Sequence, residues 1–354
     1  MIKLLGRIVL ALALWVGVTH ASYATMATSG ASADNEQSAI QCTGVNIIPD
    51  MERDQPDLAE KMRQEAADTP FGEGLIWKIE KPGTKPSYLF GTIHLADPRL
   101  LALKPAARKA FDESTTLALE ITEILDPKKL AGIAFTALQY TSYTDGSTLA
   151  DKLTEEDATL IGEVARKKLG LPWSLASKMK PWALMGALGL PACEMERKKA
   201  QLPVVDAYLG QLAQSQNKQI VPLETMIGQL QAMDSLPEDV SIKGLVQSVS
   251  LGKRMDDLFE TMIQLYLEEK TALVWSMMRR VGVDGFVEKQ DSAEYAAFQR
   301  EIVDRRNVTM VEEAEKYLEQ GGVFVAVGAL HLPGEAGMLN ILAQKGYSIS
   351  RITD

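Results

Sequence analysis

Two apolar segments, one near each end of the chain, run into the same short pattern. Tyr88-Leu89-Phe90 is followed by Gly91-Thr92-Ile93-His94, and the run Val323 to Val327 is followed by Gly328-Ala329-Leu330-His331. Each histidine stands three residues after a glycine, at the carboxyl end of a segment with the pattern of a buried strand. Since α/β enzymes gather reactive groups at the carboxyl ends of strands, the pattern predicts a sheet that carries both histidines.

The rest of the chain has strand-like segments towards its two ends and a long helical middle. Segments with β-type patterns lie at 75–80, 87–94, 116–122, 219–223, 323–327 and 347–352, and the first two flank a Pro-Gly turn and predict a hairpin. Helical spacing covers 105–114, 127–200, 203–214, 224–320 and 335–345, with breaks near Pro237, Gly252 and 281–283. We therefore expect an α/β (α+β) fold, in which N- and C-terminal strands form a mixed sheet beside a large helical middle.

The first 24 residues have the layout of a cleaved secretory signal. A short basic region (Lys3, Arg7) precedes the apolar run 8–18, and cleavage is expected after Ala21 or Ala24. The run is shorter than the roughly twenty residues that span a bilayer, although a retained N-terminal anchor is the alternative. We expect a mature protein in a bacterial periplasm, which touches the membrane only if the signal stays uncleaved.

The remaining chain divides into a tether and one domain. Residues 25–45 are small and polar, which is typical of a tether, and 46–354 are expected to form a single domain with a helical insertion at about 127–320. Cys42 and Cys193 are the two cysteines. A pair of cysteines in an oxidising compartment predicts one disulfide, with two buried free thiols as the alternative.

Net charge and missing motifs exclude several function classes. The formal net charge is -10, whereas a nucleic-acid-binding protein needs a basic face to neutralise phosphates. The sequence also contains neither the Gly-x-Ser-x-Gly elbow of serine hydrolases nor a Gly-rich phosphate loop.

A metal site is the chemistry that the histidines favour. Outside the signal, His94 and His331 are the only histidines. Glu120 is embedded in an apolar strand, where a carboxylate is costly to bury unless a metal ion or another cation faces it. Glu224 ends the extended run 220–223, and Glu123 follows Glu120 within reach of the same region if the chain turns helical there.

Two histidines and one glutamate with an open position form the ligand set of a hydrolytic zinc site, and manganese or cobalt suits such a site when more oxygens join. A bound divalent ion activates water and polarises a carbonyl, and a second glutamate can act as base. The structural alternatives are core histidines, an ordinary strand-end acid at Glu120 and a helix N-terminal carboxylate at Glu224. For the matched pair of histidines we favour the functional interpretation over the structural one.

Longer blocks around these residues carry a family resemblance over residues 42–354. The specific blocks are the two GxxH motifs with their flanks, 87–99 and 327–339. Shorter blocks are Leu119-Glu120, Lys180-Pro181-Trp182-Ala183, Leu223-Glu224-Thr225 with Gln229, and Arg306-Asn307 with Met310. Together they resemble the TraB/GumN family, which is related to the Tiki-type metalloproteases and more remotely to the erythromycin-esterase/ChaN group.

The resemblance implies an α/β core around a divalent metal ion. It implies that His94, Glu120 and His331 are metal ligands. It also implies that Glu224 is a further active-site acid and that Arg306 binds the substrate or pairs with a charged group. With Glu120, Glu224 and Arg306 as catalytic residues, the expected function is that of an exported metal-dependent hydrolase with a peptide or protein substrate. The alternatives are a non-catalytic protein that binds a peptide, haem or metal, and an accessory protein of conjugation or polysaccharide assembly.

Overall fold

The computed structural model describes residues 40–282, 285–286 and 293–354. The predicted signal sequence (1–24) and most of the predicted tether lie outside the described residues. Within these ranges no helix combines the length and the apolar character needed to cross a membrane.

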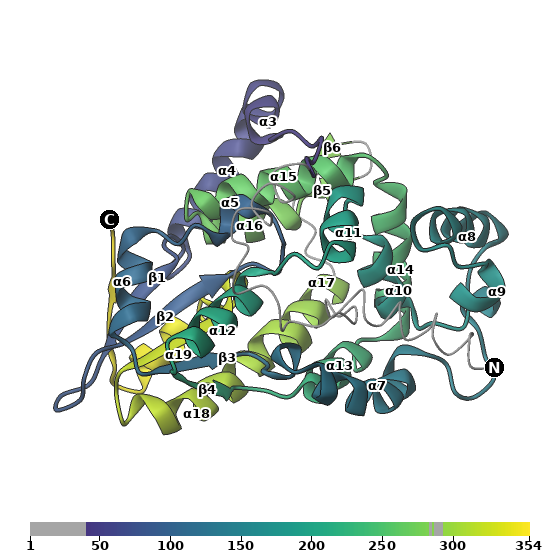
Figure 1. The fold of residues 1–354 in the computed structure, drawn as a ribbon. Helices are drawn as coiled ribbons and strands as arrows, with labels where there is room; N and C mark the ends of the chain where they lie inside the picture. Colours follow the sequence, from purple (N-terminus) through teal and green to yellow (C-terminus); the bar gives the residue numbers. More distant parts are fainter. Residues whose placement is uncertain (1–39, 283–284, 287–292) are drawn as a thin grey trace.

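A six-stranded mixed sheet organises the fold, in the order β4-β3-β7-β2-β1-β8 (Figure 1). The strands β4, β3, β7 and β2 pair in parallel, and β1 pairs antiparallel with both β2 and β8. Their bounds are β1 (Ile76–Glu80), β2 (Ser87–Thr92), β3 (Thr116–Leu119), β4 (Gln219–Pro222), β7 (Val323–Gly328) and β8 (Ser348–Arg351). The mixed α/β class and the β1–β2 hairpin are as predicted.

Two details of the strands differ from the prediction. The extended segment predicted at 219–223 is confirmed as β4, but it also joins the central sheet beside β3, so the sheet is not formed by the N- and C-terminal strands alone. The strands β2 and β3 end at Thr92 and Leu119, so His94 and Glu120 lie just beyond the sheet. A second, two-stranded sheet, β5 (Val281–Gly282) with β6 (Gly285–Phe286), forms at the break predicted near 281–283.

Helices cover the sheet and form most of the right half of Figure 1. Their bounds are α3 (Ile48–Asp54), α4 (Pro56–Asp68), α5 (Pro98–Leu101), α6 (Pro105–Glu113), α7 (Pro127–Thr141), α8 (Glu155–Leu169), α9 (Trp173–Ala176), α10 (Pro181–Leu188), α11 (Ala192–Lys199), α12 (Val205–Ser215), α13 (Met226–Asp234), α14 (Glu238–Ser250), α15 (Arg254–Leu267), α16 (Thr271–Met278), α17 (Ala293–Phe298), α18 (Arg305–Leu318) and α19 (Met338–Gln344). Short turns of 3-10 helix are η2 (Glu123–Leu125), η3 (Leu149–Asp151) and η5 (Ala329–His331), and η4 (Gln299–Asp304) is a π-helical turn.

Strand β7 divides the core into two layers. Val323, Val325 and Val327 pack with α18 and α19 on one face of the sheet. Phe324 and Ala326 pack with α6, α12 and α15 on the other. Because successive side chains of a strand point to opposite faces, a strand that is apolar throughout must be covered on both sides, as parallel strands of α/β proteins are.

The helices away from the sheet pack on one another through separate apolar clusters. One cluster joins α8, α9, α10 and α14, and another joins α7, α10 and α13. The N-terminal helices α3 and α4 pack against α15 and α16.

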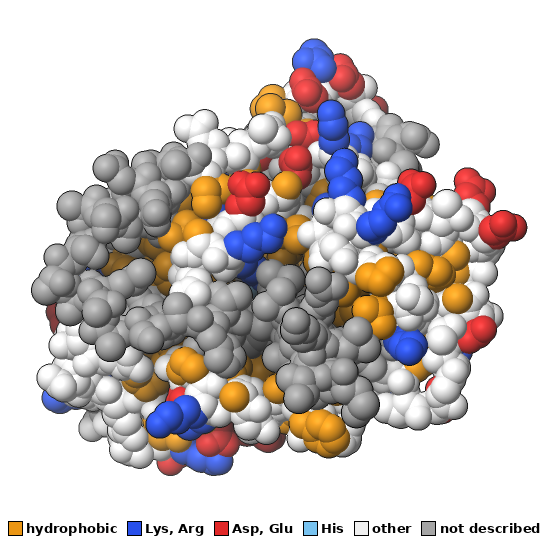
Figure 2. Space-filling model, turned by 45° about the vertical axis from the view of Figure 1, so that its right-hand side comes forward, with side chains coloured by type: hydrophobic (Ala, Val, Ile, Leu, Met, Phe, Trp, Pro, Cys, Tyr) orange, Lys and Arg blue, Asp and Glu red, His pale blue; other side chains and the backbone are white. Residues whose placement is uncertain are grey.

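On the face drawn in Figure 2, charged side chains of both signs are interspersed along the upper edge, with hydrophobic side chains between them.

A disulfide joins Cys42 to Cys193, as predicted, with Cα atoms 5.3 Å apart. It attaches the N-terminal segment to α11. Close by, the backbone N–H of Val45 donates to the Asp257 carboxylate on α15 at 2.9 Å. The end of the predicted tether is therefore fixed to the helical part of the fold.

Candidate metal centre

The carboxyl ends of four neighbouring parallel strands bring the predicted site residues together. β2 leads to His94, β7 leads to His331, β3 is followed directly by Glu120, and β4 leads to Glu224. The sheet order β4-β3-β7-β2 sets these side chains along one edge in the order Glu224, Glu120, His331, His94. Ligand sites of open α/β sheets lie at this edge.

Glu120 is the centre of the group. Its Oε1 atom lies 3.9 Å from Nε2 of His94 and 3.9 Å from Nε2 of His331. The same oxygen accepts a hydrogen bond of 2.7 Å from the backbone N–H of Gly328, and Oε2 accepts one of 2.9 Å from the amide of Gln229. The side chain of Glu120 is only 6% exposed. These hydrogen bonds therefore fix the position of a buried carboxylate.

Each imidazole is oriented through its other nitrogen. Nδ1 of His94 donates to Asp206 at 2.8 Å, and the second oxygen of Asp206 accepts from the Thr92 hydroxyl at 2.9 Å. Nδ1 of His331 donates to Oδ1 of Asn307 at 2.6 Å. Metal-binding histidines commonly have such a partner, which fixes the tautomer and leaves Nε2 available. Both Nε2 atoms here face Glu120.

Arg306, at the start of α18, links the two glutamates. Its guanidinium donates to Glu224 and Glu120 at 2.8 Å each, and another of its nitrogens lies 3.4 Å from Nε2 of His331. Arg306 also donates to the backbone carbonyl of Ile302 in the π-helical turn η4. Such turns are frequent at functional sites, and this one precedes α18 directly.

The electrostatics of the group favour an ionised glutamate and a neutral His331. Although burial opposes ionisation of Glu120, His331, Arg306 and His94 hold its pKa well below the usual range. Burial lowers the pKa of His331 to about 4, so its Nε2 carries a lone pair at neutral pH. The Asp206 carboxylate raises the pKa of His94, whose side chain is 57% exposed, to about 9. In the metal-free protein Nε2 of His94 therefore carries a proton at neutral pH, and a metal ion that binds there must displace it.

Gly328 shapes the space between the donors. A Cβ atom at this position would lie 3.3 Å from Oε1 of Glu120 and 3.7 Å from Nε2 of His94. Its backbone has φ -51 and ψ 133, which any residue can adopt, so glycine is required here for space and not for conformation. Gly91 has a similar role, because a Cβ there would come within 3.0 Å of Ala329.

The donor set fits a divalent ion. Two donors of one ion, each about 2.1 Å from it, lie at most about 4.2 Å apart, and both histidine–glutamate distances are 3.9 Å. Two imidazole nitrogens and a carboxylate oxygen suit zinc, and also manganese or cobalt. Among the described residues, no group of three or more His, Cys, Asp or Glu side chains is already arranged to hold a metal ion, so the three donors would have to close around the ion.

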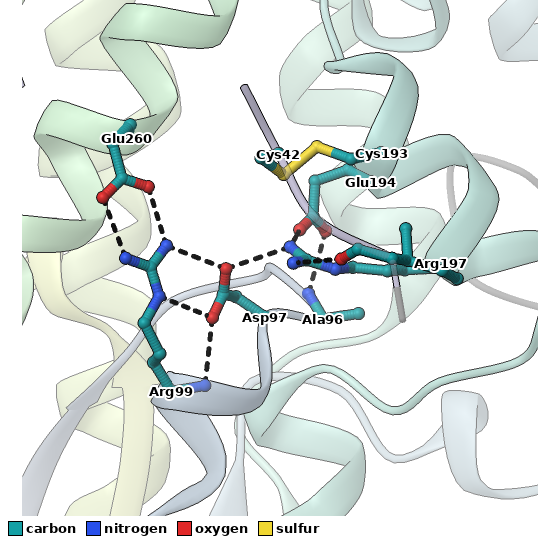
Figure 3. Close-up of a disulfide and its surroundings, with 9 residues drawn as sticks. Cys42, Ala96, Asp97, Arg99, Cys193, Glu194, Arg197 and Glu260 are labelled. Carbon is teal, nitrogen blue, oxygen red and sulfur yellow. Dashed lines mark hydrogen bonds and ion pairs between the residues drawn. A yellow bond between two sulfur atoms is a disulfide. The ribbon is translucent and has the colours of Figure 1, made fainter. Parts of the chain in front are cut away.

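A buried ionic network holds the loop that carries His94 (Figure 3). Glu194, next to the disulfide-bonded Cys193, accepts from the backbone N–H of Ala96 at 2.9 Å. Arg197 binds both Glu194 and Asp97. Asp97 in turn binds Arg99, and Arg99 pairs with Glu260 of α15 at 2.7 Å. The loop after β2 is thus tied to α11 and to α15.

No pattern in the sequence marks Asp206 or Asn307 individually as a residue of the site, and the candidate Glu123 lies outside it. Asp206 starts α12 in an apolar stretch, and only its burial (4% exposed) marks it as unusual. Asn307 entered only as part of a resembling block. Glu123 begins the turn η2, as considered, but its carboxylate accepts from the backbone N–H groups of Met226 and Thr122. It caps the chain there, and within the described part of the chain its hydrogen bonds go to these backbone groups and not to the histidines.

A comparison with protein families places the chain. A model described as the TraB/PrgY/gumN family matches residues 75–351. The chain belongs to this family. In this TraB/PrgY/gumN protein the matched span contains the whole six-stranded sheet and the residues of the candidate centre, whereas Cys42 lies before it.

The TraB/PrgY/gumN chain is also similar to a curated protein named Metalloprotease TIKI1, from Danio rerio. The two are 25% identical over 317 residues, which cover 77% of this chain and 62% of the relative. The chain therefore spans less than two thirds of that relative's length. No solved structure matches the chain significantly.

Proposed function

We propose that this TraB/PrgY/gumN protein is an exported metal-dependent hydrolase that acts on peptides or proteins. The observation that carries the proposal is the convergence of Nε2 of His94 and Nε2 of His331 on the same oxygen of Glu120, each at 3.9 Å. The distant similarity to a protein named a metalloprotease supports a peptide bond as the target.

In this proposal His94, His331 and Glu120 hold the ion, and Asp206 and Asn307 keep the imidazoles aligned. The chemistry that a divalent ion supplies when bound is Lewis-acid activation of water and of a carbonyl group.

Arg306 and Glu224 act as a pair. The guanidinium is positioned by Glu224, whose two oxygens accept from Nε of Arg306 at 3.1 Å each. A fixed cation beside the centre stabilises negative charge that develops on a substrate carbonyl. Glu224 can serve as a base only if it gives up part of this pairing, so its first role in the proposal is to orient Arg306.

The proposed location of the mature protein is the periplasm. The disulfide between Cys42 and Cys193 supports an oxidising compartment. The signal-like segment 1–24 supplies the route of export.

A protein that binds its ligand without turnover is the second candidate. Arg306 already pairs with both Glu120 and Glu224, and one of its nitrogens lies 3.4 Å from Nε2 of His331. A centre that contains a cation of its own in this way can be stable without a metal ion, which is the observation in favour of a binding role.

The test uses the mature chain without a polyhistidine tag, loaded with manganese, cobalt or zinc. We expect products from a mixed peptide library by mass spectrometry with at least one of these metals. His331→Ala should abolish them, and Gln320→Ala, at an exposed position beyond α18, should not. Retention of peptide without products under every metal would favour the binding candidate instead.

A further inference from the structure

A cavity of about 330 Å³ opens beside the candidate metal centre. Its lining includes four residues of the centre and its surroundings, His94, Glu120, Asp206 and Gln229. It also includes the apolar side chains of Ile121, Ile124, Leu190, Val204, Met226 and Leu230. The cavity therefore joins the polar groups of the centre to a hydrophobic chamber.

The same chain segments build the chamber and the centre. Ile121 follows Glu120 directly, and Leu230 follows Gln229. Ile121, Ile124, Met226 and Leu230 belong to the apolar cluster that packs α13 against α7 and α10. Because this cluster exists independently of any ligand, the walls are preformed, as those of ligand pockets usually are.

The carboxylates that face the chamber already have counter-charges. Glu120 is paired with Arg306 at 2.8 Å, and Asp206 with His94 at 2.8 Å. Burial lowers the pKa of Lys198, the remaining cation in the lining, although the Glu194 carboxylate attracts it. A charged substrate side chain would lose its hydration here without meeting an unmatched partner, which is unfavourable, whereas an apolar side chain gains from burial.

We propose that this chamber is a specificity subsite that takes the apolar side chain of the substrate residue next to the bond that is cleaved. The inference rests on the proposed hydrolase function and deepens it by naming the substrate class. The volume of the chamber, about 330 Å³, is at the lower end of the roughly 300–1,000 Å³ that ligand pockets have. The chamber therefore suits one large apolar side chain, such as Leu, Met or Phe, and not an extended stretch of chain.

Ala207 determines the size of the subsite. It follows Asp206 on α12, lines the cavity and is partly buried. Ala207→Phe would fill part of the chamber and leaves every side chain of the centre in the sequence. One methylene group more or less in a hydrophobic pocket already changes selectivity by about 10- to 200-fold. We expect turnover of peptides with Leu, Met or Phe to fall at least about 10-fold, and turnover of the matching Ala peptides to be kept.

Three controls accompany this variant. Ala131→Phe makes the same change at an exposed position of α7 outside the cavity and should leave both peptide classes unaffected. Ala207→Leu is a smaller change for the case that Ala207→Phe does not fold, as judged by its thermal transition. Metal content should be equal in wild type and in all three variants.

A binding measurement separates the subsite from catalysis. Fluorescent peptides that differ only in Leu, Ala, Asp or Lys at one position are titrated into the metal-free His94→Ala/His331→Ala protein and into the same protein with Ala207→Phe. The Leu peptide should bind most tightly, and Ala207→Phe should weaken its binding about 10-fold. If the Leu peptide has this preference but wild type shows no turnover, the hydrolase function fails and the subsite stands.

Other outcomes overturn the subsite. Equal binding of the four peptides would do so, and so would a preference for Leu that Ala207→Phe leaves unchanged. A preference for the Asp peptide that disappears in Lys198→Met would assign the cavity to acidic side chains instead.

Discussion

Asp206 accepts a hydrogen bond of 2.8 Å from Nδ1 of His94, although the two residues are 112 positions apart in the chain. The bond connects the first turn of α12 to the loop after β2. It directs Nε2 of His94 towards Glu120. The position of Asp206 therefore determines whether His94 can act together with His331.

Replacement of Asp206 should weaken metal binding. Asp206→Ala removes the partner of Nδ1 and should lower the affinity for zinc or manganese by about 10- to 100-fold. Asp206→Asn keeps an acceptor without the charge and should lower the affinity less. Isothermal titration gives both values, and Asp239→Ala on the exposed first turn of α14 is the matched control. Equal affinity in Asp206→Ala and wild type would exclude this positioning role.

A methyl group at position 328 should block the centre while the fold is kept. The Cβ of Gly328→Ala would lie 3.3 Å from Oε1 of Glu120 and 3.4 Å from Cδ2 of His331. We expect unchanged circular dichroism and a loss of bound metal. Gly132→Ala on α7, where a Cβ meets no atom within 4 Å, should bind metal as wild type does. Full metal content in Gly328→Ala would place the ion elsewhere.

Loss of Arg306 should destabilise the metal-free protein. The side chains of Glu120 and Glu224 are 6% and 8% exposed, and Arg306→Ala leaves two buried carboxylates close together without their cation. Breaking a buried pair in this way costs about 3–5 kcal/mol, which urea denaturation measures. Added zinc or manganese should restore part of the loss, since an ion supplies positive charge. Removal of the exposed Arg53 should change stability little.

The disulfide should stabilise the fold and preserve the loop of His94. It closes a loop of 151 residues, for which the chain-entropy model gives about 5 kcal/mol as an upper value. Cys42→Ser/Cys193→Ser should lower the melting temperature. It should also weaken metal binding, because Glu194, adjacent to Cys193, holds the backbone of Ala96. A variant that is less stable but binds metal with wild-type affinity would show that this coupling is absent.

Acid should weaken the network around Arg99. Hydrogen bonds from Arg99 lower the pKa of Glu260 from 4.5. A carboxylate with a lowered folded-state pKa contributes stability that is complete above its unfolded value and is lost as the pH falls through the folded one. Stability of wild type should therefore decline below pH 4.5, and Glu260→Gln should be less stable at neutral pH with a shallower acid decline. Parallel acid declines in the two proteins would contradict this assignment.

The strands that carry the site could be predicted from sequence because their signal is local. The apolar runs before Gly91 and Gly328, and the acid within another apolar run, mark His94, His331 and Glu120 without knowledge of the fold, although β2 and β3 end before His94 and Glu120. The position of β7 between β3 and β2, which brings the three residues together, is seen only in the structure. The β4 segment was recognised as extended, but the sequence pattern alone did not attach it to the sheet.

The supporting residues could not be found in the same way. Asp206 is one of 47 acidic residues, and its neighbours predict only the start of a helix. The pairing of Arg306 with Glu224 joins residues 82 positions apart, which no spacing rule reports. Orientation of the imidazoles depends on tertiary contacts, so it becomes visible only in the structure.

The central claim is that the two GxxH histidines and Glu120 hold a divalent ion. The most direct measurement is the metal content of the mature chain, purified without a polyhistidine tag or chelators and then exposed to manganese, cobalt or zinc. We predict close to one ion per chain in wild type and none in His94→Ala/His331→Ala. Wild type that retains no metal under any of these conditions would contradict the account, and the paired histidines would then serve the structure alone.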